Sequence, residues 1–227
     1  MANRNNPLIE DIFEEFYNLF SERCDNSPLL LLSEDAIRYD FFYSLTTIGN
    51  LKPSQINIEH PIHAKSFIPR MNQRSYRKEK PQMDLVVETE NLNIAAEFGM
   101  FKQNSNEEGT VNSTARTVKL LNDMIRLAID SVFTKRDSYF ICIADNTFIG
   151  HQLKSKLIGR FPSHYIITNE IIEQQMRTKT SAFDSRFLSV FTTLNTHVKA
   201  DLIFDRELVS KKIHRQAKVL IWRVSMV

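Results

Sequence analysis

Residues 80–103, KPQMDLVVETENLNIAAEFGMFKQ, carry the pattern that most constrains how this chain can fold. Two apolar runs, MDLVVE and LNIAAEFGMF, are separated by the turn-like TEN, and this order predicts two adjacent strands. The first run contains Asp84 and the second contains Glu97. A carboxylate without a partner is costly to bury in a strand, so these two acids need a physical explanation.

The spacing of the two acids predicts which face of the sheet they share. Side chains alternate between the faces of a strand, and a hairpin closing through residues 89–90 would pair Asp84 with Ala95. Asp84 and Glu97 would then be diagonal neighbours on one face, within reach of a common ion. A slip of one residue in the pairing would put them on opposite faces instead.

Two interpretations of this acid pair are open. Carboxylates that face each other repel, and oxygen ligands around a hard divalent cation, above all Mg²⁺, relieve the repulsion. Such a cation can polarise a phosphoryl oxygen and activate water for hydrolysis. The alternative is structural: the acids point to solvent from an edge hairpin, or pair with nearby Arg and Lys side chains.

The remaining patterns predict an α/β fold in which helices cover a mixed central sheet. Apolar periodicity predicts helices over 7–23, 34–48 and 113–133, with Ser33 as an N-cap and Gly49 ending the second helix. Strands are expected over 56–61 and 138–145. For the C-terminal part we expect a helix near 147–160, a strand over 164–168, helices over 169–177, 184–196 and about 201–213, and a final strand over 218–227.

Composition narrows the class of protein. With 227 residues, 42% apolar and 25% charged, the chain reads as one globular domain with an ample core. Its net charge of +2 is too small to indicate nucleic-acid binding by itself. Two isolated cysteines, Cys24 and Cys142, make a disulfide framework or a zinc-thiolate site improbable. The sequence contains no apolar stretch of membrane-spanning length, and its N-terminus carries acids where a signal peptide is apolar, so we expect a cytoplasmic protein.

The order of elements around the acids resembles the PD-(D/E)XK nuclease superfamily, the restriction-endonuclease-like enzymes. The order is a helix with an early acid, a short strand, a strand with Asp, a strand with Glu, a helix and a buried strand. Residues 81–84, P-Q-M-D, stand where the family has its P-D, and residues 97–99, E-F-G, where it has (D/E)-x-K. The resemblance covers residues 33–145, an αβββαβ core. Residues 1–32 would form an added N-terminal helix, and residues 146–227 a C-terminal extension of the same domain.

The resemblance implies a Mg²⁺-dependent endonuclease that hydrolyses DNA, with Mn²⁺ as a further candidate cofactor. Asp84 and Glu97 would be catalytic metal ligands, and the main-chain carbonyl of Phe98 would be another. Glu34 resembles the acid that many members place on the first helix, with Asp35 as its rival. Cleavage of both DNA strands would require a homodimer.

The sequence departs from the family at the lysine position, which is Gly99. Lys102 could replace that lysine if a bulge near Gly99 re-aimed its side chain. Lys119 could reach the site from the following helix. Alternatively the catalytic function is lost, and the chain is a silent nuclease-fold protein that binds DNA or a protein partner. In a plain α/β interaction domain, both lysines would simply be solvated.

Positive charge is concentrated between residues 65 and 80, where six Lys or Arg residues occur with Phe67 and Tyr76 among them. As a DNA-contacting loop this segment would supply phosphate contacts, and two arginines of the following helix could extend the surface. An ordinary solvated loop is the alternative, because charge runs usually have that role. The expected DNA-binding residues are Arg70, Arg74, Arg77, Lys78, Lys80, Arg116 and Arg126.

Overall fold

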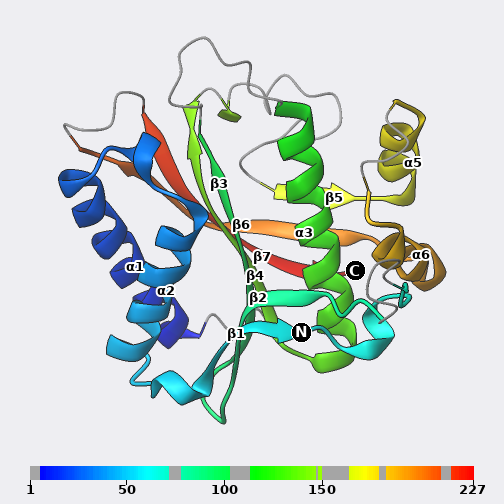
Figure 1. Ribbon diagram of the computed structural model, residues 1–227, viewed down its shortest axis with the longest axis horizontal. Coiled ribbons are helices and arrows are strands. Elements are labelled where there is room, and N and C mark those ends of the chain that lie inside the picture. Colours follow the sequence, from blue (N-terminus) through cyan, green and yellow to red (C-terminus); the bar gives the residue numbers. More distant parts are fainter. Residues whose placement is uncertain are drawn as a thin grey trace.

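The computed structural model describes residues 6–71, 78–102, 113–146, 148–149, 164–178, 183–210 and 216–227. Within them a seven-stranded mixed sheet is flanked by five α-helices (Figure 1). The helices are α1 (Pro7–Asn26), α2 (Glu34–Thr47), α3 (Ser113–Thr134), α5 (Asn169–Thr178) and α6 (Ser185–Leu194). The strands are β1 (Ile56–Pro61), β2 (Gln82–Glu88), β3 (Asn93–Phe101), β4 (Asp137–Asp145), β5 (His164–Ile167), β6 (Val198–Leu208) and β7 (Ala217–Met226).

The sheet is open, with the strand order β1-β2-β3-β4-β7-β6-β5. Only β3 and β4 pair in parallel, and every other neighbouring pair is antiparallel. A parallel pair needs a crossover connection, and α3 provides it between β3 and β4. The predicted α/β class with a mixed, helix-covered sheet is therefore confirmed.

Helices cover both faces of the sheet. In Figure 1, α1 and α2 lie on one side of the strands and α3 on the other. Two apolar clusters match this arrangement, and alternate residues of β3 divide between them: Ile94, Ala96 and Phe98 belong to the α1/α2 side, and Ala95 and Phe101 to the α3 side. By the same alternation, Glu97 lies on the α3 face of the sheet.

The hairpin between β2 and β3 forms, but its register differs from the predicted one by two residues. Val86 pairs with Ala95 and Leu85 with Ala96, so the next position along the ladder sets Asp84 opposite Glu97. The reason is a longer turn, in which the Thr89 amide donates to the Leu92 carbonyl (2.9 Å) and the Thr89 hydroxyl lies 3.1 Å from the Leu92 amide. The shift keeps the two acids next to each other, but the alternation of β2 is interrupted at Asp84, since Met83 packs on the α3 side and Leu85 on the α1/α2 side.

The prediction of a helix over residues 201–213 is wrong, because β6 extends through Leu208 and pairs with β7. A register shift between Leu202 and Phe204 explains the misleading pattern. Before it, Val198 and Ala200 pack on the α3 side, and beyond it Phe204 and Leu208 pack on the α1/α2 side. This change of face removes the two-residue alternation by which a strand is recognised.

The other predicted elements agree with the structure to within a few residues, including the helices at α5 and α6 and the strand at β5. Most of the helix expected near 147–160 lies outside the described residues. In the described part of the chain, the model contains no helix with the length and apolarity required to span a membrane.

Candidate functional site: an acid–base cluster between the sheet and α3

One stripe of α3 faces the two strand acids. Lys119, Asp123 and Arg126 are spaced i, i+4 and i+7, so they lie on one side of the helix. This side faces Glu97 on β3, and Asp84 of β2 is an electrostatic neighbour of that carboxyl. Glu34 and Arg38, from the first two turns of α2, complete what we call the acid–base cluster. Its members are Glu34, Arg38, Asp84, Glu97, Lys119, Asp123 and Arg126.

Glu97 is the most deeply buried acid of the strand pair, with 2% of its surface exposed. Its Oε2 accepts a hydrogen bond from Arg126 Nη2 at 2.9 Å, but its Oε1 is buried and has no hydrogen-bond partner in the described part of the chain. Burial raises the pKa of Glu97 well above its usual value, and the nearby Asp123 and Asp84 add to the rise. One oxygen of this carboxylate is therefore available to a ligand.

Asp84 lies where the pairing of β2 with β3 ends, next to an irregular position in the pairing of β2 with β1. Its Oδ1 accepts from Arg38 Nη2 at 2.9 Å, and its Oδ2 accepts from the backbone N–H of Phe98 at 3.0 Å. On the other side, the residue between Ile58 and His60 in β1 is Glu59, whose φ of 51° is unusual for a non-glycine residue. The Phe98 N–H therefore donates to the Asp84 side chain and not to the backbone of β2, which keeps the carboxylate beside β3.

Lys119 makes close contacts with three oxygen atoms. Its Nζ lies 3.0 Å from Glu34 Oε2 and 3.0 Å from the main-chain oxygen of Phe98. Asp123 Oδ2 is 3.3 Å away, as an ion pair without good hydrogen-bond geometry. Burial lowers the pKa of Lys119, but the charges of Asp123 and Glu34 outweigh it and raise the pKa above the usual value. The amine is therefore held as an ammonium.

Asp123 is a fourth carboxylate of the cluster, and it is 4% exposed. Its Oδ1 accepts from Arg126 Nη2 at 2.6 Å, so Arg126 bridges Asp123 and Glu97. Burial raises the pKa of Asp123, and the charges of Lys119 and Arg126 oppose that rise. The cluster holds four carboxylates and three basic side chains, so its formal charge is negative when all of them are ionised.

The donor set fits a hard divalent cation, which prefers carboxylate and carbonyl oxygens. Asp84, Glu97 and the Phe98 carbonyl come from adjacent strands, Glu34 approaches from α2, and the buried Oε1 of Glu97 is without a partner. Yet no three His, Cys, Asp or Glu side chains of the described residues form a ready-made metal site. In the described structure, Arg38, Lys119 and Arg126 make the close contacts with these oxygens instead.

Lys102 is directed away from the cluster. Its Nζ donates to the carbonyls of Leu29 (3.0 Å) and Leu30 (2.6 Å), and also to that of Leu32. β3 pairs continuously with β4 from Ile94 to Phe101, so the bulge that would re-aim Lys102 is absent from this pairing. Of the two candidate lysines, the structure brings only Lys119 to the acids.

Aromatic packing explains why residue 99 is glycine. A Cβ at Gly99 would lie 2.8 Å from Phe101 Cε2 and 3.0 Å from Phe140 Cζ, closer than real contacts of this kind. The Phe101 ring is 1% exposed and stacks on Phe148 with centroids 4.4 Å apart, so it has little room to move. A side chain at the family's lysine position would therefore disturb the core on the α3 side.

The expected DNA-binding residues differ in their surroundings. Arg70, Lys78 and Lys80 are exposed, while Arg74 and Arg77 lie outside the described residues. Arg116 contacts the Lys102 carbonyl. Arg126 is a member of the acid–base cluster, bound to two carboxylates.

Sequence reasoning missed the roles of Arg38 and Asp123, and it interpreted Arg126 only as a DNA contact. The spacing of Lys119, Asp123 and Arg126 on one helix face was a usable signal, since three charged groups in one stripe next to a buried strand need partners. Asp35, the rival of Glu34, lies at 3.5 Å from Arg38 and is 82% exposed in its side chain. Glu34 is the acid that contacts Lys119.

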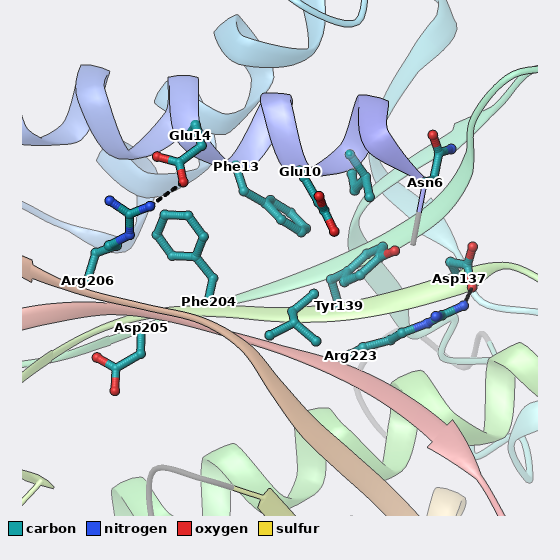
Figure 2. A pocket seen from close by; sticks show the side chains of 12 residues that line it. Asn6, Glu10, Phe13, Glu14, Asp137, Tyr139, Phe204, Asp205, Arg206 and Arg223 are labelled. Carbon is teal, nitrogen blue, oxygen red and sulfur yellow. Dashed lines mark hydrogen bonds and ion pairs between the residues drawn. The ribbon is translucent and has the colours of Figure 1, made fainter. Parts of the chain in front are cut away.

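A separate pocket of about 370 Å³ lies between α1 and the strands β4, β6 and β7 (Figure 2). Phe13, Tyr139 and Phe204 line its apolar part. At its rim, Glu14 pairs with Arg206 at 2.5 Å and Asp137 pairs with Arg223 at 2.6 Å. None of the acid–base cluster residues lines this pocket, so it is distinct from the candidate site.

No family model, curated protein or solved structure matches the chain. The link to the nuclease superfamily therefore remains a prediction based on the motif residues and the order of the elements.

Proposed function

We propose that this protein is a Mg²⁺-dependent endonuclease of the PD-(D/E)XK type that hydrolyses phosphodiester bonds in DNA. The observation that carries the proposal is the buried Oε1 of Glu97, which has no hydrogen-bond partner among the described residues and belongs to a carboxylate that neighbours Asp84. An unsatisfied buried acceptor costs about 1–3 kcal/mol of folding free energy, so folded proteins seldom retain one without a functional reason. A divalent cation between the two acids would satisfy it.

Each member of the cluster then has a defined task. Asp84, Glu97 and the Phe98 carbonyl would hold the ion, with Glu34 as a further ligand. The bound ion would polarise the phosphate and make water a stronger nucleophile. Lys119 would supply the positive charge that the family places on its motif lysine, because its ammonium already lies 3.0 Å from the Phe98 carbonyl. Arg126 would hold Glu97 in position through its 2.9 Å contact.

DNA is the proposed substrate because exposed basic residues lie on the segment that precedes β2. Arg70, Lys78 and Lys80 are exposed there, and Glu79 of the same segment pairs with Arg186 at 3.1 Å, which docks the segment on α6. Phosphate contacts from such residues position a duplex without reading its sequence. We expect a homodimer for cleavage of both strands, with one site from each subunit.

One observation favours a second candidate, a catalytically silent nuclease-fold protein that binds DNA or a protein partner. Arg38 and Arg126 already form ion pairs with Asp84 and Glu97, at 2.9 Å in both cases. If these pairs persist in solution when a divalent ion is present, the cluster would be a structural network.

Cleavage assays distinguish the two candidates. Supercoiled DNA, linear DNA and RNA are incubated with wild type, Asp84→Ala, Glu97→Ala and the control Asp137→Ala, in Mg²⁺, Mn²⁺ or chelator. Asp137 is an acid at the start of β4 that pairs with Arg223 outside the cluster. We expect metal-dependent DNA cleavage that falls at least about 100-fold in both cluster variants, since even residues that only support metal ligands are worth 10–100-fold. Equal activity in all four proteins, or none in any of them, would contradict the endonuclease proposal.

A further inference from the structure

We propose that Lys119 is a built-in counter-ion that holds the divalent-cation position in the metal-free protein and leaves it when the ion binds. This inference rests on the proposed metal site and concerns how that site is regulated. It predicts that the ion and the lysine ammonium compete for the Glu34 carboxylate and the Phe98 carbonyl. Loading the site with metal would at the same time free the lysine for a phosphate.

The contacts of Lys119 are those of a cation in an oxygen site. Its Nζ is 3.0 Å from Glu34 Oε2, 3.0 Å from the Phe98 carbonyl oxygen and 3.3 Å from Asp123 Oδ2. Two carboxylates and a main-chain carbonyl are the ligand types that Mg²⁺ takes in proteins. A lysine on a solvated helix face has no need of a carbonyl inside a buried strand, so the position of the amine reflects the charge of the site.

Of the three basic residues in the cluster, Lys119 is the one that can leave most easily. Its side chain is 46% exposed, against 24% for Arg126 and 20% for Arg38. Arg126 also bridges two carboxylates, and its planar guanidinium is fixed by both. An ammonium on a flexible stem can instead turn into solvent without disturbing the packing of α3.

Charge and hydrogen bonding favour such an exchange. Four carboxylates face three basic groups, and among the described residues Glu97 Oε1 has no hydrogen-bond partner even with Lys119 in place. A divalent ion brings one more positive charge than the ammonium it replaces, and it can accept several oxygen ligands at once.

The test measures Mn²⁺ binding to the full chain by calorimetric titration, with free Mn²⁺ counted by electron paramagnetic resonance. The proteins are wild type, Lys119→Met and the control Lys135→Met, which removes an exposed lysine just beyond α3. If Lys119 competes with the ion, Lys119→Met binds Mn²⁺ more tightly than wild type by about 5- to 150-fold, the usual range of coupling between two ligands. Lys135→Met matches wild type.

A second measurement follows the lysine itself. Acylation of the Lys119 amine, read by mass spectrometry, is expected to be slow in chelator and several-fold faster with saturating Mn²⁺. The rate at Lys135 in the same samples is expected to stay constant. An unchanged rate at Lys119 despite ion binding contradicts the exchange.

The outcomes separate this inference from the proposed function. Equal or weaker Mn²⁺ binding by Lys119→Met, with normal binding by wild type, overturns the exchange and leaves the endonuclease proposal standing. Tighter binding by Lys119→Met together with no cleavage by wild type supports the exchange and overturns the endonuclease. Absence of Mn²⁺ binding in every protein overturns both.

Discussion

Arg126 Nη2 lies 2.9 Å from Glu97 Oε2, yet this ion pair does not compensate the burial of the carboxylate. The pKa of Glu97 remains well above its usual value because burial outweighs the attraction of Arg126. At neutral pH, burial of the ionised Glu97 carboxylate therefore lowers the free energy of unfolding.

The first prediction concerns the pH dependence of stability at Glu97. A carboxyl whose pKa is raised in the folded state binds more protons there than in the unfolded chain, so stability falls as pH rises from about 4.3 through the folded pKa. In chelator at pH 7–8, Glu97→Gln is expected to be more stable than wild type, because it removes the cost of burying an ionised carboxylate. The difference should vanish near pH 4. Urea denaturation from pH 4 to pH 8 measures it.

Glu88 provides the matched control with the opposite sign. A side-chain hydrogen bond from Arg136 lowers the pKa of Glu88, so its stabilising effect is present above the unfolded pKa and is lost as pH falls. Glu88→Gln should therefore be less stable than wild type at neutral pH and equal to it in acid. If both variants change stability in the same direction at pH 7, burial of Glu97 is not the cause.

The second prediction is that a lysine cannot simply be restored at residue 99. Gly99→Ala is expected to lower the free energy of unfolding by about 1–3 kcal/mol through overpacking against Phe101, and Gly99→Lys by at least as much. Neither variant should gain nuclease activity. In a Phe101→Leu background the cost of Gly99→Ala should shrink, and a double-mutant cycle in urea measures the coupling. Additive effects would exclude the aromatic contact as the reason for glycine.

The third prediction separates the two lysines. Lys102 donates to carbonyls at the end of the α1–α2 connection, so Lys102→Met is expected to cost about 1–3 kcal/mol of stability and to leave cleavage by the folded protein near wild type. Lys119→Met should lower kcat by about 100- to 1,000-fold, as expected for loss of a group that stabilises developing charge. Kinetics below the melting temperature of both variants test this. Loss of activity in Lys102→Met alone would reverse the assignment.

The fourth prediction concerns Asp130, which ties the segment after β1 to α3. Asp130 is fully buried, pairs with Arg136 at 3.1 Å and accepts from the His63 amide at 3.0 Å. Asp130→Ala should lower the free energy of unfolding by about 3–5 kcal/mol, because it leaves the buried Arg136 with one partner fewer. Asp137→Ala, which removes an exposed partner of Arg223, should cost no more than about 1 kcal/mol. Similar losses in the two variants would contradict this reading.

The fifth prediction concerns DNA binding by the basic segment. Combined replacement of Arg70, Lys78 and Lys80 by Ala should weaken binding alike for unrelated duplex sequences. The slope of log K against log salt concentration should become shallower by about 0.9 for each phosphate contact that is lost. Fluorescence anisotropy between about 50 and 200 mM salt, the range over which such losses are large, measures it. Lys52→Ala, at an exposed lysine before β1, serves as the control, and an unchanged slope in the triple variant would exclude the segment.

Local patterns predicted most of the fold. The capped amphipathic helices and the continuous apolar strand at β4 were identified because their periodicity comes from burial on one face or on both. The hairpin register was two residues off, since four residues rather than two separate the strands and the Thr89–Leu92 contacts are visible only in the structure. β6 was mistaken for a helix because its bulge changes the buried face halfway along the strand.

The candidate site could be predicted only in part, because some of its residues are not distinctive in the local sequence. Asp84 and Glu97 stand out because a charged residue in an apolar run contradicts its surroundings. Arg38, Asp123 and Arg126 lie among other charged residues on helices. The local sequence of such a helix does not indicate that one of its charged residues pairs with a residue of the sheet. Their roles depend on how α2 and α3 are placed against β2, which is a property of the tertiary structure.

The helix α3 is also the crossover connection that the parallel strands β3 and β4 require. Three members of the cluster therefore lie on an element that this fold cannot lose. Insertion of a single residue in the first turns of this helix would swing the stripe by about 100°, carrying every one of those groups off the acids together. Changes to the cluster would therefore proceed by exchanging side chains along α3, and insertions or deletions in the helix would be confined to the part beyond Arg126.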